Sequence, residues 1–339
     1  MKTTIHANQK TNFKFVSKSN LKNIALLFLT AGAFISCDNN DHPITPASAA
    51  EFSAVREAAL EGQTQKFTAT AGAGVITLTS ANGVVITLNG NCLTKNGSPV
   101  TGAIDIEYVE LFDKGTMLVT NKPTMGIMPN GDRALLISGG EFYINATQGG
   151  VDLVPTCNIN LKVPAALTNG VDNAMTLWTG IIDNEGNLAW ADARDAAGTN
   201  GKGGVEAGQN SYYVSFGNFG WTNVDKFYSD PRPKTTILVG APTGYDNTNS
   251  AIYLSYDGEG TNALAKLDTF TNAGLFSEHY GQIPVGLACH IIFVTEENGQ
   301  WRYAIKGVTI QANDVFQFTI GETTVGTEAQ LVAAINAIQ

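Results

Sequence analysis

From Gln65 onward, apolar residues recur at every second position in short runs that end at Gly and Asn. A period of two places apolar side chains on one face of a β-strand, whereas a helix needs a period of about 3.6. Residues 74–80 and 83–89 are two such runs, and the Ala-Asn-Gly sequence between them is typical of a hairpin turn. The pattern therefore predicts an all-β chain built from antiparallel strands.

Further strand-like runs continue this pattern, and the turn dipeptides Asn-Gly and Gly-Gly separate them. The 339 residues also exceed what one hydrophobic core usually serves. Short strands at regular spacing are typical of β-sandwiches. We therefore expect two antiparallel β-sandwich domains, residues 66–165 and residues 231–339, with a Trp- and Gly-rich β region at residues 166–230 between them. The further runs cover residues 104–111, 134–138, 141–146, 158–164, 235–239, 251–256, 290–295, 301–305 and 315–320.

Two short segments depart from the period of two. Residues 51–61 have apolar side chains at helical spacing, which indicates a short amphipathic helix. Residues 327–338 show the same spacing, and Thr327 is suited to cap the first turn. We expect this C-terminal helix to pack on the second sandwich.

The first 36 residues differ from the rest because they contain five Lys and no acidic residue. Residues 24–35 then form an apolar run, which as a helix would rise about 18 Å, well short of the roughly 30 Å hydrocarbon core of a membrane. A basic segment, a short apolar run and a small residue before a cut indicate a secretory signal. We therefore expect residues 1–36 to be a signal peptide and residues 37–65 to form a flexible tether and the short helix.

The apolar run ends at Phe34-Ile35-Ser36-Cys37, which resembles a bacterial lipobox. In a lipobox, signal peptidase cuts before a Cys that has received a diacylglyceryl thioether. The match departs from the motif at Phe34, where an aliphatic residue is common. The resemblance implies that Cys37 is lipidated and that its acyl chains hold the mature protein in the membrane. Ordinary cleavage nearby, which would leave Cys37 as a stray thiol, is the alternative.

Asp38 and Asp41 follow Cys37 closely, and this acidic stretch resembles the surface-export signal of Bacteroidota lipoproteins. The resemblance implies an outer-membrane protein exposed at the cell surface; a soluble spacer and an inner-membrane retention signal are the alternatives. Without residues 1–36 the chain has 15 basic and 30 acidic residues. This negative charge argues against nucleic acid as a partner, because phosphates attract a basic surface.

Two further segments share a resemblance. Residues 90–110 contain Asn-Gly-Ser-Pro-Val-Thr-Gly before an alternating strand, and residues 212–225 end in Gly-Trp-Thr-Asn-Val-Asp. Both resemble modules of uncharacterised Bacteroidota (Flavobacterium-like) surface lipoproteins, in which the second module has the pattern Gly-Trp-x-Asn-x-Asp. The resemblance covers about residues 90–320 and implies a two-part β-sandwich architecture, with no particular activity.

Trp221, Asn223 and Asp225 match the second module. From their chemistry we expect Trp221 to cover a seam of the core, and Asn223 and Asp225 to satisfy loop amides. A ligand platform is the alternative, because aromatic rings and amides together suit sugars.

Sequence motifs of catalysis are missing: there is no Gly-x-Ser-x-Gly, His-Glu-x-x-His, P-loop or dinucleotide fingerprint. After residue 36 the His residues are His42, His279 and His290, and none stands in a catalytic or metal-binding pattern. Residues 183–187 and 246–249 are rich in oxygen side chains, but their spacing fits hairpin turns better than a calcium loop. We therefore expect no enzyme, no cofactor and no metal site.

The remaining cysteines are Cys92, Cys157 and Cys289. The cell envelope permits disulfides, and Cys92 can pair with Cys157 if their strands are neighbours. The interpretation we favour is that all three are small buried apolar side chains.

The leading hypothesis is a surface-anchored, non-catalytic lipoprotein that acts as an accessory or structural subunit of an envelope protein complex. Its expected partners are the membrane, through the lipid anchor, and outer-membrane β-barrel proteins. The second hypothesis is glycan binding, with Trp178, Trp190, Trp221 or Tyr245 as stacking surfaces. A fimbrial subunit that polymerises by strand exchange ranks third, because the mature chain has no Arg before Arg56 to provide a processing site.

Overall fold

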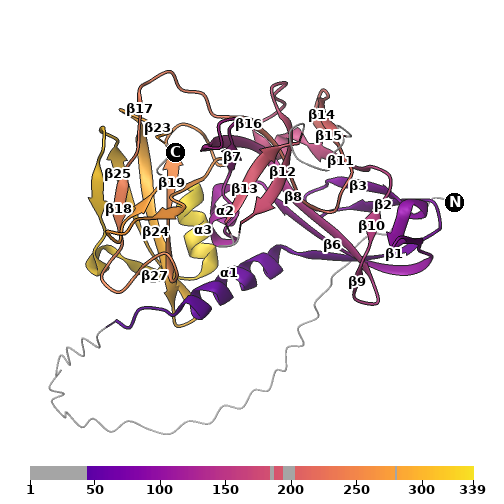
Figure 1. Ribbon diagram of the computed structural model, residues 1–339, viewed down its shortest axis with the longest axis horizontal. Helices are drawn as coiled ribbons and strands as arrows, with labels where there is room; N and C mark the ends of the chain where they lie inside the picture. Colours follow the sequence, from indigo (N-terminus) through magenta and orange to yellow (C-terminus); the bar gives the residue numbers. More distant parts are fainter. Residues whose placement is uncertain (1–43, 184–186, 194–202, 279–280) are drawn as a thin grey trace, which may run out of the picture. The chain divides into compact units, whose positions relative to one another are not determined.

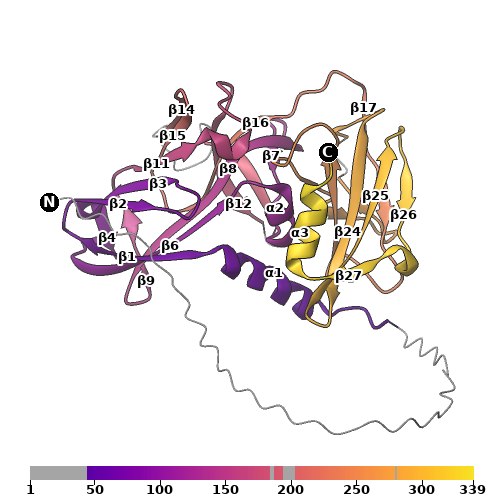
Figure 2. The same ribbon diagram turned by 180° about the vertical axis from the view of Figure 1, so that it is seen from behind.

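The structure, a computed structural model, describes residues 44–183, 187–193, 203–278 and 281–339 (Figures 1 and 2). It is mostly β, with 49% strand and 14% helix, which confirms the predicted predominance of strands. Contacts join Pro46–Gln339 into one compact unit. The lipobox at residues 34–37 and the acidic stretch behind it lie outside the described residues.

The largest sheet, called the central sheet below, has the strand order β1-β6-β8-β16-β12-β13-β7, and β9 pairs with β8. Its pairs are antiparallel except β13–β7, which is parallel. Its strands are β1 (Gln65–Ala71), β6 (Gly102–Leu111), β7 (Met125–Ile127), β8 (Arg133–Gln148), β9 (Val151–Asp152), β12 (Thr176–Ile182), β13 (Leu188–Asp192) and β16 (Gly220–Phe227).

A second sheet, called the outer sheet, has the order β14-β15-β11-β3-β2. One apolar core joins the outer sheet and the central sheet. It includes Ile86, Leu161 and Tyr212 of the outer sheet and Ile106 and Phe142 of the central sheet. The outer sheet comprises β2 (Val75–Thr79), β3 (Val85–Asn89), β11 (Ile159–Pro164), β14 (Gly204–Ala207) and β15 (Ser211–Phe216). A small sheet beside them comprises β4 (Leu93–Lys95), β5 (Ser98–Pro99) and β10 (Val154–Pro155), and two 3-10 turns, Gly90–Cys92 and Ala165–Thr168, connect strands.

The C-terminal part of the chain contains a five-stranded sheet in the order β20-β19-β24-β25-β27, called the C-terminal sheet. A four-stranded sheet, β21-β22-β18-β26, and the pair β17–β23 accompany it. A second apolar core includes Ile252, Ile291 and Phe293 of the C-terminal sheet together with Val239 and Phe276 of the four-stranded sheet. These strands are β17 (Lys234–Thr235), β18 (Leu238–Gly240), β19 (Ser250–Tyr256), β20 (Ala265–Lys266), β21 (Thr269–Phe270), β22 (Phe276–Ser277), β23 (Ile283–Pro284), β24 (Ala288–Glu297), β25 (Gln300–Thr309), β26 (Val315–Gln317) and β27 (Thr324–Gly326).

Three helices share a third apolar core with the central and C-terminal sheets: α1 (Ala49–Gln63), α2 (Lys114–Val119) and α3 (Glu328–Asn336). The expected helices are confirmed as α1 and α3, and Thr327 caps α3 as predicted by accepting from Gln330 N. The sequence analysis missed α2, a short helix that Asp113 caps.

The predicted division into two sandwich domains is not confirmed. Strands from residues 166–230, expected to connect two domains, instead pair into the central sheet: β12 pairs with β16, and β16 pairs with β8. Met125 and Leu135 of the central sheet also contribute to the core of the C-terminal part. A closed five-stranded barrel is present as well, which the two-sandwich prediction did not include. Local periodicity predicts strands, but pairing between distant strands decides how they divide into layers.

The predicted hairpin is confirmed, because β2 and β3 pair from Val75↔Asn89 to Thr79↔Val85. Residues 134–138 and 141–146, expected as separate strands, form the single strand β8. Gly139 and Gly140 keep that strand continuous: a Cβ on Gly139 would lie 2.9 Å from Val224 O, and Gly140 has φ +123°. The Gly-Gly pair therefore permits a close strand contact here, where two separate strands were expected.

The favoured interpretation of the cysteines is wrong for two of the three. Cys92 and Cys157 form a disulfide, whereas Cys289 is a buried free thiol. The pairing follows from the small sheet, in which Val154↔Thr94 and Pro155↔Leu93 bring the two chain segments side by side. Within the described ranges, no helix has the length and apolar character needed to cross a membrane.

Candidate functional site

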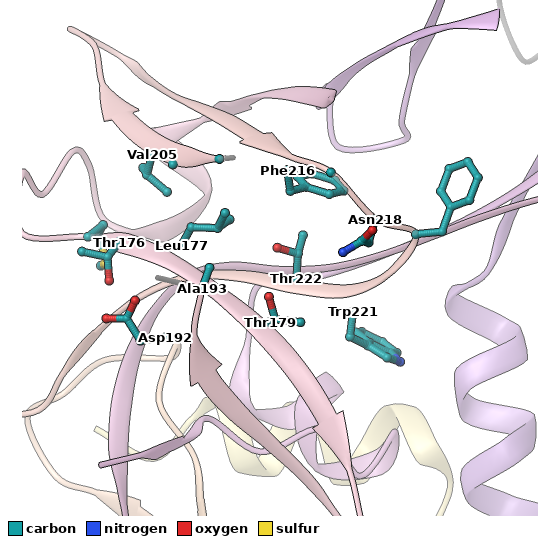
Figure 3. A pocket seen from close by; sticks show the side chains of 15 residues that line it. Thr176, Leu177, Thr179, Asp192, Ala193, Val205, Phe216, Asn218, Trp221 and Thr222 are labelled. Carbon is teal, nitrogen blue, oxygen red and sulfur yellow. The ribbon is translucent and has the colours of Figure 1, made fainter. Parts of the chain in front are cut away.

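A cavity of about 260 Å³ lies where the central sheet and the outer sheet separate, and we call it the sandwich-end cavity (Figure 3). The view shows Val205 and Phe216 on one side of it and Thr176 and Leu177 on the other. Its lining residues are Met175, Thr176, Leu177, Thr179, Asp192, Ala193, Gly203, Gly204, Val205, Phe216, Gly217, Asn218, Phe219, Trp221 and Thr222. Residues 194–202, between Ala193 and Gly203, lie outside the described residues.

The cavity has an apolar floor and polar groups around it. Leu177 and Phe216 belong to the core between the two sheets, and Val205 packs against that core. Thr179 and Thr222 stand opposite each other on β12 and β16. The Thr222 hydroxyl donates to Trp178 O at 3.0 Å. Such a lining suits a small group with one apolar side and one polar side.

Glycine residues shape the approach of the outer sheet to the cavity. A Cβ on Gly203 would lie 2.5 Å from Ser215 O and 3.0 Å from Leu177 Cδ2, so any side chain there would collide with β15. Gly203 also has φ +152°, a conformation that other residues rarely adopt. In the sequence this position is only one of several Gly in the Trp- and Gly-rich region of residues 166–230, so no local pattern indicated a site.

Trp221 is placed at the edge of this cavity and packs toward the helices. Its ring centroid lies 5.3 Å from that of Tyr143 and 6.4 Å from that of Trp190. Lys122 Nζ lies 5.3 Å from the Trp221 ring centroid, close enough for a cation–π contact. Trp221 is half-buried and contacts the core of helices, central sheet and C-terminal sheet.

Asn223 and Asp225 do not face the cavity or a loop. Both are fully buried within β16, next to a β-bulge. Asn223 Nδ2 donates to Asp225 Oδ2 at 2.6 Å, and Ser138 Oγ donates to Asn223 Oδ1 at 3.0 Å. They therefore bond to each other and to β8 rather than to loop amides, and Asp225 Oδ1 stays buried without a hydrogen-bond partner among the described residues. The structure does not bring them together with the Trp221 ring as a platform.

Glu141 extends this buried polar group. It pairs in register with Asn223, is fully buried, and neither carboxyl oxygen has a hydrogen-bond partner within the described ranges. Burial raises the pKa of Glu141 well above its usual value, the nearby Asp225 raises it further, and Lys122 opposes the shift. Burial likewise raises the pKa of Asp225, against hydrogen bonds from Ser138 and Gly139. Both carboxyl groups are therefore more easily kept neutral than exposed ones.

The other aromatic residues expected as stacking surfaces are buried. Trp178 is 2% exposed, Trp190 0% and Tyr245 8%. Trp178 Nε1 donates to Asp225 O and Trp190 Nε1 donates to Pro123 O, so both indoles are fixed within the core. A sugar ring cannot reach these three faces in this arrangement.

The remaining chemical candidates are dispersed. His290 Nδ1 lies 2.8 Å from Asp257 Oδ1 on the C-terminal sheet, and His42 and His279 lie outside the described residues. Asp246 accepts hydrogen bonds from Thr248 N and Thr248 Oγ1 and so stabilises a turn, but it is not the expected hairpin turn, because β18 and β19 on either side belong to different sheets. Of residues 183–187, only the two end residues are described. In the described part of the chain, no three His, Cys, Asp or Glu residues gather to hold a metal ion.

Comparisons with known proteins do not assign this chain to a class: no family model matches it, and no curated protein matches it.

Proposed function

We propose that this protein is a lipid-anchored, non-catalytic lipoprotein of the outer membrane that acts as an accessory subunit of an envelope protein complex. The supporting observation is the sandwich-end cavity, in which threonine hydroxyls surround an apolar floor. The described residues that line it include no Ser, Cys, Lys or His. The cavity thus has the chemistry to hold a group from a partner, such as an apolar side chain on a loop of an outer-membrane β-barrel protein.

The anchor part of this proposal depends on Cys37, which the sequence predicts to be lipidated. Cys37→Ala removes the thiol that would accept the acyl chains, so the variant should leave the outer-membrane fraction or stall as an uncut precursor. The described body should fold unchanged, because Cys37 precedes the whole compact unit. Fractionation together with mass spectrometry of the mature N-terminus tests this. A wild-type N-terminus at another, unlipidated residue would disprove the anchor.

The binding part is tested by filling the cavity. Val205→Trp places a large side chain at the lining of the sandwich-end cavity and should reduce the amount of partner that co-purifies in mild detergent at least ten-fold. The matched control is Val75→Trp on β2 of the same sheet, where the side chain is 69% exposed and away from the cavity. Equal recovery of a partner with both variants, or no reproducible partner with the wild type, would contradict the proposal.

Glycan binding is the second candidate, and Trp221 at the cavity edge is the observation that favours it. Glycan-array binding that Trp221→Ala abolishes and Val205→Trp also abolishes would place this function above the first. The fimbrial hypothesis has no supporting feature in the described structure.

A further inference from the structure

A second cavity, of about 320 Å³, lies where α1, the segment after α2 and strands β20 to β22 meet, and we call it the Arg56–Lys266 cavity. It shares no lining residue with the sandwich-end cavity. Its polar lining comes from distant parts of the chain and includes Arg56, Asn121, Asn187, Asn247, Lys266 and Asp268.

Arg56 is the unusual member of this lining. Its guanidinium carbon lies 3.8 Å from the centroid of the Phe52 ring, while Nε and Nη2 are buried and have no hydrogen-bond partner among the described residues. Burial lowers the pKa of Arg56, and the electrostatic interaction and hydrogen bond of its guanidinium with the Tyr253 side chain oppose that shift. The Nε–Nη2 edge is the side of a guanidinium that binds two oxygens of a carboxylate or phosphate at once. Buried donors are rarely left unpaired, so this edge is suited to a ligand acceptor.

Lys266 provides a second buried cation beside the same cavity. Its Nζ donates to Asn187 Oδ1 at 2.6 Å and to Asn121 Oδ1 at 3.1 Å. Asn121 Oδ1 also accepts from the Tyr253 hydroxyl at 2.7 Å. Because the Asn121 oxygen already has two donors, the Asn121 side chain can offer only its Nδ2 hydrogens to a ligand. The lining is therefore rich in donors.

The charge of the surroundings also favours an anion. Burial, together with the positive charges of Arg56 and Lys122, lowers the pKa of Lys266 to about 7, against the opposing effects of Asp268 and Asp183. The Asp268 carboxylate is itself compensated by Arg133, whose Nη1 lies 2.5 Å from Asp268 Oδ2. Cations thus gather around one cavity in a chain whose formal net charge is −10.

We propose that the Arg56–Lys266 cavity binds a small molecule through an oxyanion group, a carboxylate or a phosphate, with the Nε–Nη2 edge of Arg56 as the main contact and Lys266 as the second. A bound oxyanion satisfies the unpaired guanidinium edge and compensates the clustered cations. The site is distinct from the sandwich-end cavity, so it adds a small-molecule function to the partner-binding function proposed above.

The test is thermal unfolding of the detergent-solubilised full chain against inorganic phosphate or sodium acetate, with chloride holding the ionic strength constant. Saturable stabilisation by one probe is expected, because a ligand of the folded state raises the midpoint with concentration. Stronger stabilisation by phosphate would indicate a phosphate ligand, and stronger stabilisation by acetate would indicate a carboxylate ligand. Failure of both probes to stabilise the wild type in a saturable way would overturn the proposal.

Three variants test whether the stabilisation by phosphate or acetate arises from binding in the Arg56–Lys266 cavity. Arg56→Gln should weaken probe binding at least ten-fold, and Arg232→Gln, at an arginine paired with Asp230 outside the cavity, should leave it unchanged. Asn247→Asp adds a negative charge at an exposed lining position and should weaken binding without disturbing the core, so it serves if Arg56→Gln does not fold. Equal probe binding by Asn247→Asp and wild type would overturn the site. If the wild type binds the probe but no partner co-purifies with it reproducibly, only the function proposed for the sandwich-end cavity is rejected.

Discussion

The two faces of the central sheet differ in chemistry although the same strands build both. Toward the outer sheet, Phe142 of β8 and Val224 of β16 enter an apolar core. Their chain neighbours Glu141, Asn223 and Asp225 are fully buried polar residues associated with the helix side, where Lys122 also lies. Since successive strand residues point to opposite faces, one residue step separates a core built by apolar burial from a buried polar group.

The comparison shows which face of the central sheet stabilises the fold and which face contains groups whose contribution depends on pH. Apolar burial contributes about 25 cal/mol per Å² and is largely indifferent to pH. Buried ionisable groups contribute little net stability, and their contribution depends on pH. The apolar face therefore holds the two sheets together, whereas the stability of the region between the polar face and the helices depends on pH.

The largest expected effect comes from breaking the apolar face with Phe142→Ala. The Phe142 ring packs against Phe112, with centroids 5.8 Å apart, and against Tyr108 at 6.4 Å. Removing it leaves a cavity and should lower the free energy of unfolding by about 3–5 kcal/mol. Urea denaturation at pH 5 and pH 8 should give the same loss. The matched control is Tyr143→Ala, the next residue on the half-buried opposite side, and a larger loss there would contradict the comparison.

A smaller effect is expected from breaking the polar group with Asn223→Leu. The change removes the hydrogen bonds that join Asn223 to Ser138 and Asp225. Leaving these buried partners unsatisfied should cost about 1–3 kcal/mol in the free energy of unfolding. The double variant Asn223→Leu with Asp225→Leu should recover part of the loss, because an apolar pair leaves fewer unpaired groups. Denaturant titrations of the wild type, Asn223→Leu and the double variant measure this, and a double variant that is less stable than Asn223→Leu would disprove it.

The sequence predicted those features that depend on neighbours in the chain. The Ala-Asn-Gly turn between β2 and β3 and the capping Thr327 of α3 have local causes, so they were found. The Arg56–Lys266 cavity was missed because its contacts join distant residues: Lys266 lies 79 positions from Asn187 and 145 from Asn121. Asn223 and Asp225 were located by motif, but their burial depends on β8 pairing, which no local pattern shows.

The smallest expected effect is a gain in stability from Glu141→Gln, and its size depends on pH. The pKa of Glu141 is raised well above its usual value in the folded state, mainly by burial and also by Asp225. Its contribution to stability is therefore complete below the unfolded pKa, near 4.5, and is lost as the pH rises toward the folded value. Glutamine resembles the neutral carboxyl group and does not titrate, so it avoids that loss.

Glu141→Gln should therefore have the same free energy of unfolding as the wild type near pH 4. At pH 7 its free energy of unfolding should be higher than that of the wild type by on the order of 1 kcal/mol, because each pH unit in the titration window corresponds to about 1.4 kcal/mol. Thermal unfolding across pH 4–8 measures the difference. Glu107→Gln on β6 is the control, because Glu107 is exposed and should give no such pH-dependent gain. If Glu141 is instead ionised and stabilised by Lys122, the variant should be less stable than the wild type at pH 7. That result would mean that the polar face contributes stability as an ion pair, and the contrast between the two faces would no longer hold.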